Sequence, residues 1–394
     1  MTSTVAECPT SPIDLYSDES LLNPYENYRK LRDIAPLVYF PHYKAYVVTR
    51  FQQVREALRN SKVFSSAQGI MLNDKMNEAV RGIVLCSDDP EHAAMRKVLQ
   101  RPITPQGILS YKEMIDAEAE SLIERLVQKG RINAATELAQ HLPVTIVSKL
   151  VGLPEEGRDR MLDWASASFQ CFGPQNKRTE DAISIVEELV NYSFTKCTPD
   201  RLRPGSWGKM LWEAAERGEL DMAKPPIMMT DYVGPALDTT IFATSSLIWL
   251  FSQNRDQWEL LRQNRDLLPN AINEAIRIES PVQSFSRVAL QDVDYEGITL
   301  PANGRVIMQV GSANRDERRW GNPEVFDIRR SNADHLGFGF GTHVCAGMHL
   351  AKMEITALVQ ALLSRVKHIE CHGSERLLNN VARGFCKLDV TLVC

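Results

Sequence analysis

The chain lacks the paired cysteines that a disulfide framework or a zinc site needs. Its eight cysteines are scattered over 394 residues, and none of them forms a Cys-x-x-Cys pair with another. Such spacing fits reduced thiols better than a secreted scaffold or a structural zinc site. Each cysteine therefore has to be considered on its own.

Long apolar runs and long basic runs are also missing. No stretch approaches the roughly 20 apolar residues of a membrane span, and residues 1–17 lack the basic start and apolar centre of a signal peptide. The formal net charge of −5 argues against a nucleic-acid partner. We expect a cytoplasmic protein that binds neither a membrane nor a nucleic acid.

Most of the chain has the hydrophobic periodicity of α-helices. We predict helices over residues 21–33, 51–59, 91–100, 111–128, 138–150, 158–169, 179–192, 207–217, 226–252, 255–264, 269–278 and 348–363. Paired strands are predicted over residues 37–39 and 45–49, and further strand signals lie between residues 285 and 308. No repeat or low-complexity linker divides the chain. The sequence predicts a mainly α fold with a minor β lobe, in one domain covering residues 1–394.

The most informative stretch is residues 338–347, which read Phe-Gly-Phe-Gly-Thr-His-Val-Cys-Ala-Gly and precede a helical pattern. Gly339, Gly341 and Gly347 permit backbone angles and close approaches that a side chain would forbid. The following helix N-terminus favours a thiolate at Cys345. A thiolate that is held still and hydrogen-bonded in this way is suited to ligate a metal.

Two polar pairs lie in other predicted helices. His92 and Arg96 stand at i and i+4, so both could reach one anionic group. Asp238 and Thr239 lie side by side in the long segment at 226–252, where a carboxylate and a hydroxyl can relay protons. Pro235, just before them, removes a backbone donor and is predicted to kink that helix.

These features together resemble the cytochrome P450 family. The stretch at 338–347 matches the haem-binding loop Phe-Gly-x-Gly-x-His-x-Cys-x-Gly at every fixed position, and the other motifs follow in the family's order. The resemblance implies the cytochrome P450 fold, with haem b between the long central helix and the cysteine loop. It implies that Cys345 is the axial iron ligand, that Asp238 and Thr239 serve oxygen activation, and that four residues contact the haem propionates: His92, Arg96, Arg287 and His343. His335 is a further propionate candidate or an ordinary loop histidine.

Glu274 and Arg277, one helical turn apart, correspond to the family's Glu-x-x-Arg motif. Alone they would be typical of a solvated helix surface. In the family this pair is an internal structural lock that a later arginine completes, and Arg330 stands at that position.

The resemblance also implies a monooxygenase, which inserts one atom of O₂ into a C–H bond and needs two electrons per turnover. The chain has no Gly-rich dinucleotide fingerprint and no room for a flavin domain. We therefore expect an external NAD(P)H-dependent partner, an iron-sulfur ferredoxin with its reductase or an equivalent. Arg96, Lys97 and Arg101 are either part of a basic docking face or a solvated edge.

The substrate pocket is predicted from segments that line it in the family. Its expected residues are Gln68, Phe169, Phe172, Thr230, Val233, Ala236, Val282, Phe285 and Phe385. Four phenylalanine and valine side chains, at 169, 172, 282 and 285, would form a flat aromatic slot.

The segments around residues 171–174, 280–283 and 311–316 resemble the bacterial subfamily that demethylates para-methoxybenzoates. Gln68 and Thr230 stand where those relatives place arginines, and Asp231 nearby would repel a carboxylate. We therefore expect a neutral aromatic ether, such as a lignin-derived 4-alkylguaiacol, to be O-demethylated to a catechol and formaldehyde. A methoxybenzoate, another small apolar substrate, a peroxygenase and a non-catalytic haem sensor remain as alternatives.

Overall fold

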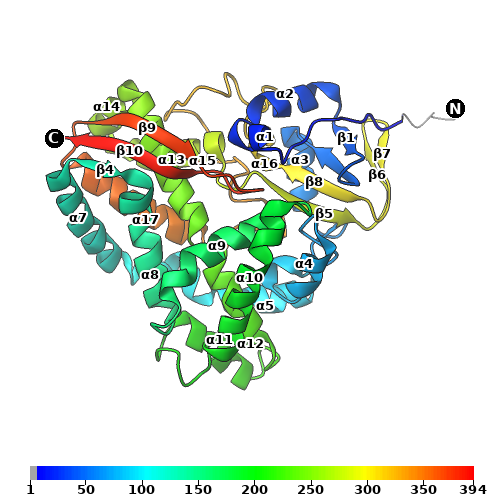
Figure 1. Cartoon of the computed structure of the whole chain (residues 1–394), viewed down its shortest axis with the longest axis horizontal. Helices are drawn as coiled ribbons and strands as arrows, with labels where there is room; N and C mark the ends of the chain where they lie inside the picture. The colour runs from blue at the N-terminus through cyan, green and yellow to red at the C-terminus, as the bar shows by residue number, and fades with distance from the viewer. Residues whose placement is uncertain (1–6) are drawn as a thin grey trace.

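Helices form most of the structure and fill its lower part in the view of Figure 1. The computed structural model describes residues 7–394, so the first six residues of the polar N-terminal stretch lie outside it. The helices before the middle of the chain are α1 (Asp18–Leu22), α2 (Tyr25–Ile34), α3 (Phe51–Arg59), α4 (Asp74–Ala79), α5 (Glu91–Gln100), α6 (Pro105–Leu109), α7 (Lys112–Lys129), α8 (His141–Val151), α9 (Met161–Gln170) and α10 (Lys177–Thr195). Those that follow are α11 (Trp207–Glu216), α12 (Lys224–Val233), α13 (Asp238–Gln253), α14 (Arg255–Gln263), α15 (Leu268–Glu279), α16 (Val310–Ala313) and α17 (Met348–Leu363). Among residues 7–394, no helix is long and apolar enough to cross a membrane.

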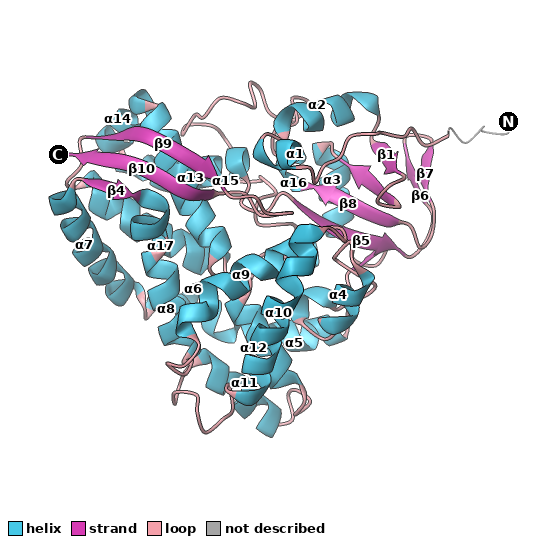
Figure 2. Ribbon diagram, viewed as in Figure 1, coloured by secondary structure: helices cyan, strands magenta, loops and turns pink. Residues whose placement is uncertain are grey.

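The strands form three small sheets at the upper edge of the molecule (Figure 2). The largest sheet has the order β1-β2-β8-β5-β3, and it is antiparallel except for the parallel pairing of β2 with β8. A second sheet has the order β4-β10-β9, and β6 pairs with β7. The strands are β1 (Leu37–Phe40), β2 (Ala45–Val48), β3 (Phe64–Ser65), β4 (Arg131–Asn133), β5 (Ser284–Ala289), β6 (Val293–Tyr295), β7 (Ile298–Leu300), β8 (Arg305–Gln309), β9 (His368–Arg376) and β10 (Phe385–Val393).

The predicted fold class is confirmed, whereas several element bounds differ from the prediction. The hairpin of β1 and β2 and the strand signals between residues 285 and 308 are present as expected. The long strands β9 and β10 were not predicted. In β10 the buried side chains of Leu388, Val390 and Leu392 alternate with more exposed ones, which is the period-two pattern of a strand with one buried face.

Helix α13 lies at the centre of the fold because its side chains are apolar or small on nearly every face. It packs against α15, against β9 and against the π-helical turn at Ala134–Ala139. The main cluster of buried hydrophobic side chains runs from Leu15 to Leu392 and includes residues of both the helices and the sheets. This continuity favours the prediction of a single domain.

The segment predicted as one long helix over residues 226–252 is interrupted. Helix α12 ends at Val233 and α13 begins at Asp238, with turns between them. Pro235 explains the break, since it has no N–H to donate and its ring clashes with the preceding turn. The predicted kink is therefore confirmed, and it is a complete interruption of the helical hydrogen bonding.

Glu274 is the centre of a buried ionic network. Its carboxylate accepts hydrogen bonds from Arg277 at 2.8 and 2.9 Å and from Arg330 at 2.9 Å, and Asn332 donates to it at 3.2 Å. Glu274 and Arg277 are both fully buried. Burial raises the pKa of Glu274, but the two arginines and Asn332 more than offset this effect, so its pKa lies below the usual value. The predicted structural lock is thus present, joining α15 to the segment that leads to the cysteine loop.

We predict that Glu274→Gln lowers the free energy of unfolding by about 3 kcal/mol or more, because it leaves the buried Arg277 and the partly buried Arg330 without a counter-charge. Chemical denaturation followed by circular dichroism would measure the change. Glu259→Gln is the matched control, since Glu259 and Arg262 form an exposed pair with the same helical spacing, and its effect should stay below about 0.5 kcal/mol. Equal effects of the two substitutions would contradict the assignment.

Candidate active site

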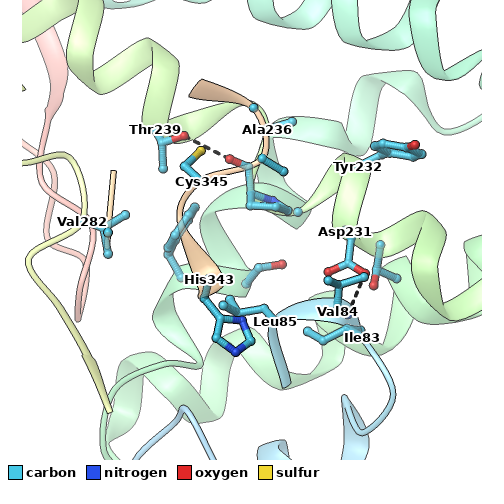
Figure 3. Close-up of a pocket in the computed structure, with 18 of the residues that line it drawn as sticks. Ile83, Val84, Leu85, Asp231, Tyr232, Ala236, Thr239, Val282, His343 and Cys345 are labelled. Carbon is cyan, nitrogen blue, oxygen red and sulfur yellow. Dashed lines mark hydrogen bonds between the residues drawn. The ribbon is translucent and has the colours of Figure 1, made fainter. Parts of the chain in front are cut away.

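The loop that carries Cys345 is fixed by its own backbone. The amide of Cys345 donates to the carbonyl of Phe338 at 2.8 Å, and the amide of Val344 donates to Gly341 at 3.1 Å. Gly339 and Gly341 have φ values of +73° and +76°, which residues with a side chain adopt only at a cost. This shape presents Cys345 to a buried cavity that it helps to line (Figure 3).

Gly341 and Gly347 of this loop play different parts. A Cβ on Gly341 would lie 2.9 Å from both the Leu58 carbonyl oxygen and the Arg59 Cα, so only glycine fits beside α3. Gly347 has φ −86°, and a Cβ there would meet no protein atom within 4 Å. Its backbone therefore does not require glycine. Because Gly347 lines the cavity, its open side instead leaves room for a bound group.

The Cys345 thiol is subject to opposing influences. Burial raises its pKa, whereas the N–H groups of Gly347 and Met348 and the charges of Arg96 and Lys352 act to lower it. The two amides belong to the start of α17, so the predicted helix N-terminus is in place. A thiolate formed here would find hydrogen-bond donors already oriented toward its sulfur.

His92 and His343 come together from α5 and the cysteine loop. Their ring centroids are 4.2 Å apart. The Nδ1 atom of His92 is 3.2 Å from Asp89, and the Nε2 atom of His343 is 3.0 Å from Ser66. The other ring nitrogen of each histidine is buried without a hydrogen-bond partner among the described residues. Burial lowers the pKa of His343 to about 3, and the unpaired nitrogens call for a partner that residues 7–394 do not supply.

Arg287 and Arg96 line the same cavity. Arg287 is buried and donates to the Ser286 carbonyl at 2.8 Å, but no carboxylate within residues 7–394 forms a salt bridge with it. Burial lowers the pKa of Arg287 to about 10. Arg96 donates to the Val344 carbonyl, which places it inward and not on a docking face. The four predicted propionate contacts therefore converge, and their cations lack an anion from the chain.

For the other basic residues, the contacts distinguish between the alternatives that the sequence left open. His335 is buried, accepts a hydrogen bond from the Gly337 amide at 3.0 Å and does not line the cavity, so it is a loop histidine. Arg101 pairs with Glu219 at 2.5 Å on the surface, while Lys97 is exposed beside it. The alternative of a solvated edge fits these contacts.

The opposite wall of the cavity is apolar and partly aromatic. The rings of Phe169 and Phe172 stack with centroids 5.9 Å apart, and Phe172 meets Phe285 edge-on at 5.9 Å. Val282 and Ala236 also line the cavity, as does Thr230. The sequence thus placed six of the nine pocket residues on the wall.

The other three predicted pocket residues lie elsewhere. Gln68 is exposed on its loop, Val233 is buried in the packing of α12, and Phe385 packs against Trp249 and Arg376. The sequence reasoning missed cavity residues before α5 and on α10, which are Ile83, Val84, Leu85, Val186, Leu189 and Val190. On α10 the apolar spacing at 186, 189 and 190 could have indicated a buried face.

Thr239 and Asp238 follow the interruption between α12 and α13. The Thr239 hydroxyl donates to the Pro235 carbonyl at 3.0 Å and lines the cavity. Asp238 is buried, does not line the cavity, and its Oδ2 atom has no partner among the described residues. Burial raises the pKa of Asp238 to about 7. The pair therefore offers a hydroxyl at the cavity wall and a carboxyl that can exchange a proton near neutral pH.

A family model described as Cytochrome P450 matches residues 250–389. The protein "Cytochrome p450 CYP199A2" of Rhodopseudomonas palustris is 32% identical to this chain over 98% of this chain and 95% of its own length. The chain belongs to the cytochrome P450 family. A "Steroid C26-monooxygenase" of Rhodococcus jostii is 30% identical over 93% of this chain and 80% of its own length. The crystal structure of P450BioI in complex with an acyl carrier protein superimposes with a TM-score of 0.86, at 27% identity and with 95% and 99% of the two chains covered.

Family membership makes this chain a cytochrome P450 monooxygenase whose cofactor is haem b. The cavity fits that group on its own features. Buried arginines without a counter-charge and histidine nitrogens without partners suit the two propionates, and the open side of Gly347 suits a flat macrocycle next to Cys345. The donor set of one thiol and several cations matches haem ligation through a thiolate.

We predict that Gly341→Ala reduces the yield of thiolate-ligated haem, because alanine meets both a left-handed φ and a 2.9 Å contact with α3. The backbone strain alone should cost about 1–3 kcal/mol. The absorption band of the ferrous carbon monoxide complex, relative to total protein, measures the yield. Gly373→Ala is the control, since Gly373 lies on β9 with no atom within 4 Å of the added Cβ; a similar loss in this variant would contradict the prediction.

Proposed function

We propose that this cytochrome P450 O-demethylates a neutral para-substituted methoxyphenol such as a 4-alkylguaiacol. Hydroxylation of the methoxy carbon consumes O₂, two electrons and two protons and gives a hemiacetal and water. The hemiacetal then breaks its C–O bond to release a catechol and formaldehyde. The observation that carries the proposal is the stacked aromatic wall of Phe169, Phe172 and Phe285, which suits a flat ring.

The proposed roles of the site residues follow from their positions. We assign Cys345 as the axial ligand, since its sulfur faces the cavity beside two amide donors. His92, Arg96, Arg287 and His343 would hold the propionates. Haem bound through a thiolate supplies the oxygen activation. Thr239 would hydrogen-bond near the oxygen, and Asp238 would deliver protons from its buried position at the start of α13.

The charge of the cavity supports a neutral substrate. Within residues 7–394, the cavity lining includes two arginines, Arg96 and Arg287, and no lysine. Both arginines lie next to the histidine pair that we assign to the propionates. Their cations are therefore already neutralised when haem is bound. A substrate carboxylate against the aromatic wall would lack a counter-charge, which is costly in a buried site. Gln68 is exposed and does not line the cavity, so it does not affect the charge that a substrate meets there.

Two other substrate classes are outcomes of the same test. A 4-methoxybenzoate-type acid would need a cation that the described cavity residues do not offer. A different small apolar compound is favoured by the range of the relatives, which include "Linalool 8-monooxygenase" of Pseudomonas putida at 29% identity.

We further propose a ferredoxin and its reductase, or an equivalent NAD(P)H-dependent partner, as the electron source, and catabolism of lignin-derived aromatics as the setting.

An optical titration of the ferric holoenzyme tests the substrate class. We expect 4-propylguaiacol to shift the Soret band toward the high-spin form and 4-methoxybenzoate to leave it unchanged. Formaldehyde and catechol should then appear in equal amounts when electrons are supplied. A shift with the benzoate alone would reverse the charge argument, and a shift with neither would exclude both methoxyarenes.

We predict that Asp238→Asn lowers the rate of product formation by about a hundredfold, the size expected for loss of a general acid. Because the pKa of Asp238 is about 7 and the protonated form donates, the wild-type rate should fall as the pH rises through 7. The variant should lose this pH dependence. Asp256→Asn, at an exposed position, should retain the wild-type rate and profile. A pH profile shared by wild type and Asp238→Asn would exclude this role.

A further inference from the structure

Asp231 presents a carboxylate to the cavity from α12 (Figure 3). Its Oδ2 atom accepts a hydrogen bond from the Val84 amide at 3.0 Å, and the Leu85 amide also donates to the carboxylate. These bonds join α12 to the segment before α5. The proposed propionate and oxygen roles make no use of this group.

Asp231 has no ion-pair partner among the described residues, although the charge of Arg96 acts on it. Among residues 7–394, no lysine, arginine or histidine forms a salt bridge with it. Burial raises its pKa to about 7, which the two amides and the more distant Arg96 only partly offset. Its labelled neighbours Ile83, Val84 and Leu85 are apolar. A carboxyl group in such surroundings is stabilised by any hydrogen-bond donor that a ligand brings.

The position of Asp231 determines which end of a ligand it meets. Figure 3 shows Asp231 on the other side of the pocket from Thr239 and Cys345. A group that contacts Asp231 is therefore remote from the reacting carbon.

The break after α12 also leaves a backbone acceptor at residue 231. The carbonyl of Asp231 would receive a hydrogen bond from residue 235 in a continuous helix, but Pro235 has no N–H. No other backbone amide in the described chain donates to this carbonyl. Residue 231 therefore supplies a carboxylate to the cavity lining and a backbone carbonyl without an amide donor.

We propose that Asp231 accepts a hydrogen bond from a hydroxyl group at the substrate end remote from the reacting methoxy carbon, and that it disfavours a carboxylate there. The inference rests on the proposed O-demethylation and restricts the range of its substrates. The substrate becomes a methoxyarene whose para alkyl chain ends in a hydroxyl, such as 4-(3-hydroxypropyl)guaiacol. Asp231 acts as a specificity residue and takes no part in the oxidation.

The variant Asp231→Asn distinguishes ligand recognition from a purely structural role of Asp231. Asp231→Asn keeps an oxygen that can accept from Val84 and Leu85, so the link between α12 and the segment before α5 is preserved. The amide NH₂ group then replaces the acceptor that faces the cavity with a donor. Ligand preference should change while the fold does not. The ferrous carbon monoxide spectrum and the thermal midpoint of the holoenzyme verify that the variant is folded.

The first test compares spectral dissociation constants for 4-(3-hydroxypropyl)guaiacol and 4-propylguaiacol. We expect the wild-type holoenzyme to bind the hydroxylated compound about tenfold more tightly, as one hydrogen bond to a charged group allows. Asp231→Asn should weaken this preference severalfold, because its neutral amide can form only a neutral hydrogen bond with the hydroxyl, and should keep its affinity for 4-propylguaiacol. Asp256→Asn should behave as wild type. A preference that is undiminished in Asp231→Asn, or that is absent from the wild type, overturns the proposal.

A second test does not depend on the substrate class. Two 1-phenylimidazoles, one with a para hydroxymethyl group and one with a para carboxylate, bind the haem iron through the imidazole. The wild type should favour the hydroxymethyl compound, and Asp231→Asn should shift the ratio of the two dissociation constants toward the carboxylate by about tenfold or more. This shift without any response to guaiacols would refute the O-demethylase proposal and uphold the role of Asp231. An unchanged ratio would refute the role itself.

Discussion

The buried carboxylate of Glu274 is the constraint on which the position of the active site depends. An isolated charge in the interior is costly, so Glu274 must be surrounded by donors, and only Arg277 among them comes from the same helix. Arg330 and Asn332 are drawn onto α15 in this way. The Asn332 carbonyl accepts from the His335 amide, and the Leu336 carbonyl accepts from Gly339. The cysteine loop thus begins from a segment that the ionic network has already fixed.

Two regions of the cavity carry polar groups that lack partners, and the groups differ in kind. At one side, the buried Arg287 has no carboxylate partner, and one ring nitrogen of each of His92 and His343 has no hydrogen-bond partner among the described residues. At the other, the Asp231 carbonyl receives no backbone hydrogen bond, and its carboxylate accepts from the amides of Val84 and Leu85 without an ion-pair partner among the described residues. Burial makes each of these groups costly unless something binds to it. The groups that would bind a cofactor and those that would bind a ligand therefore lie in separate, chemically distinct regions of one cavity.

Features set by a few adjacent residues could be predicted from the sequence, and features set by distant segments could not. The glycine pattern around Cys345, the helical spacing of His92 and Arg96, and the break at Pro235 all depend on local geometry. Gln68 and Phe385 were placed on the cavity wall wrongly, because their orientation depends on the path of an exposed loop and on the irregular pairing of β10 with β9 beside Phe385. The contribution of α10 to the wall depends on how helices pack, which the spacing of Val186 and Leu189 alone leaves open.

The interruption at residues 234–237 separates substrate recognition on α12 from oxygen chemistry at the start of α13, two functions that a continuous helix would couple. Within a helix, each turn is tied to the next by hydrogen bonds, so a shift in one turn displaces its neighbours. Between α12 and α13 this ladder is broken. Substitutions on α12 can therefore reshape the recognition end of the cavity while Thr239 keeps its place at the start of α13. Such independence allows substrate range to diverge over evolutionary time while the oxygen chemistry is retained.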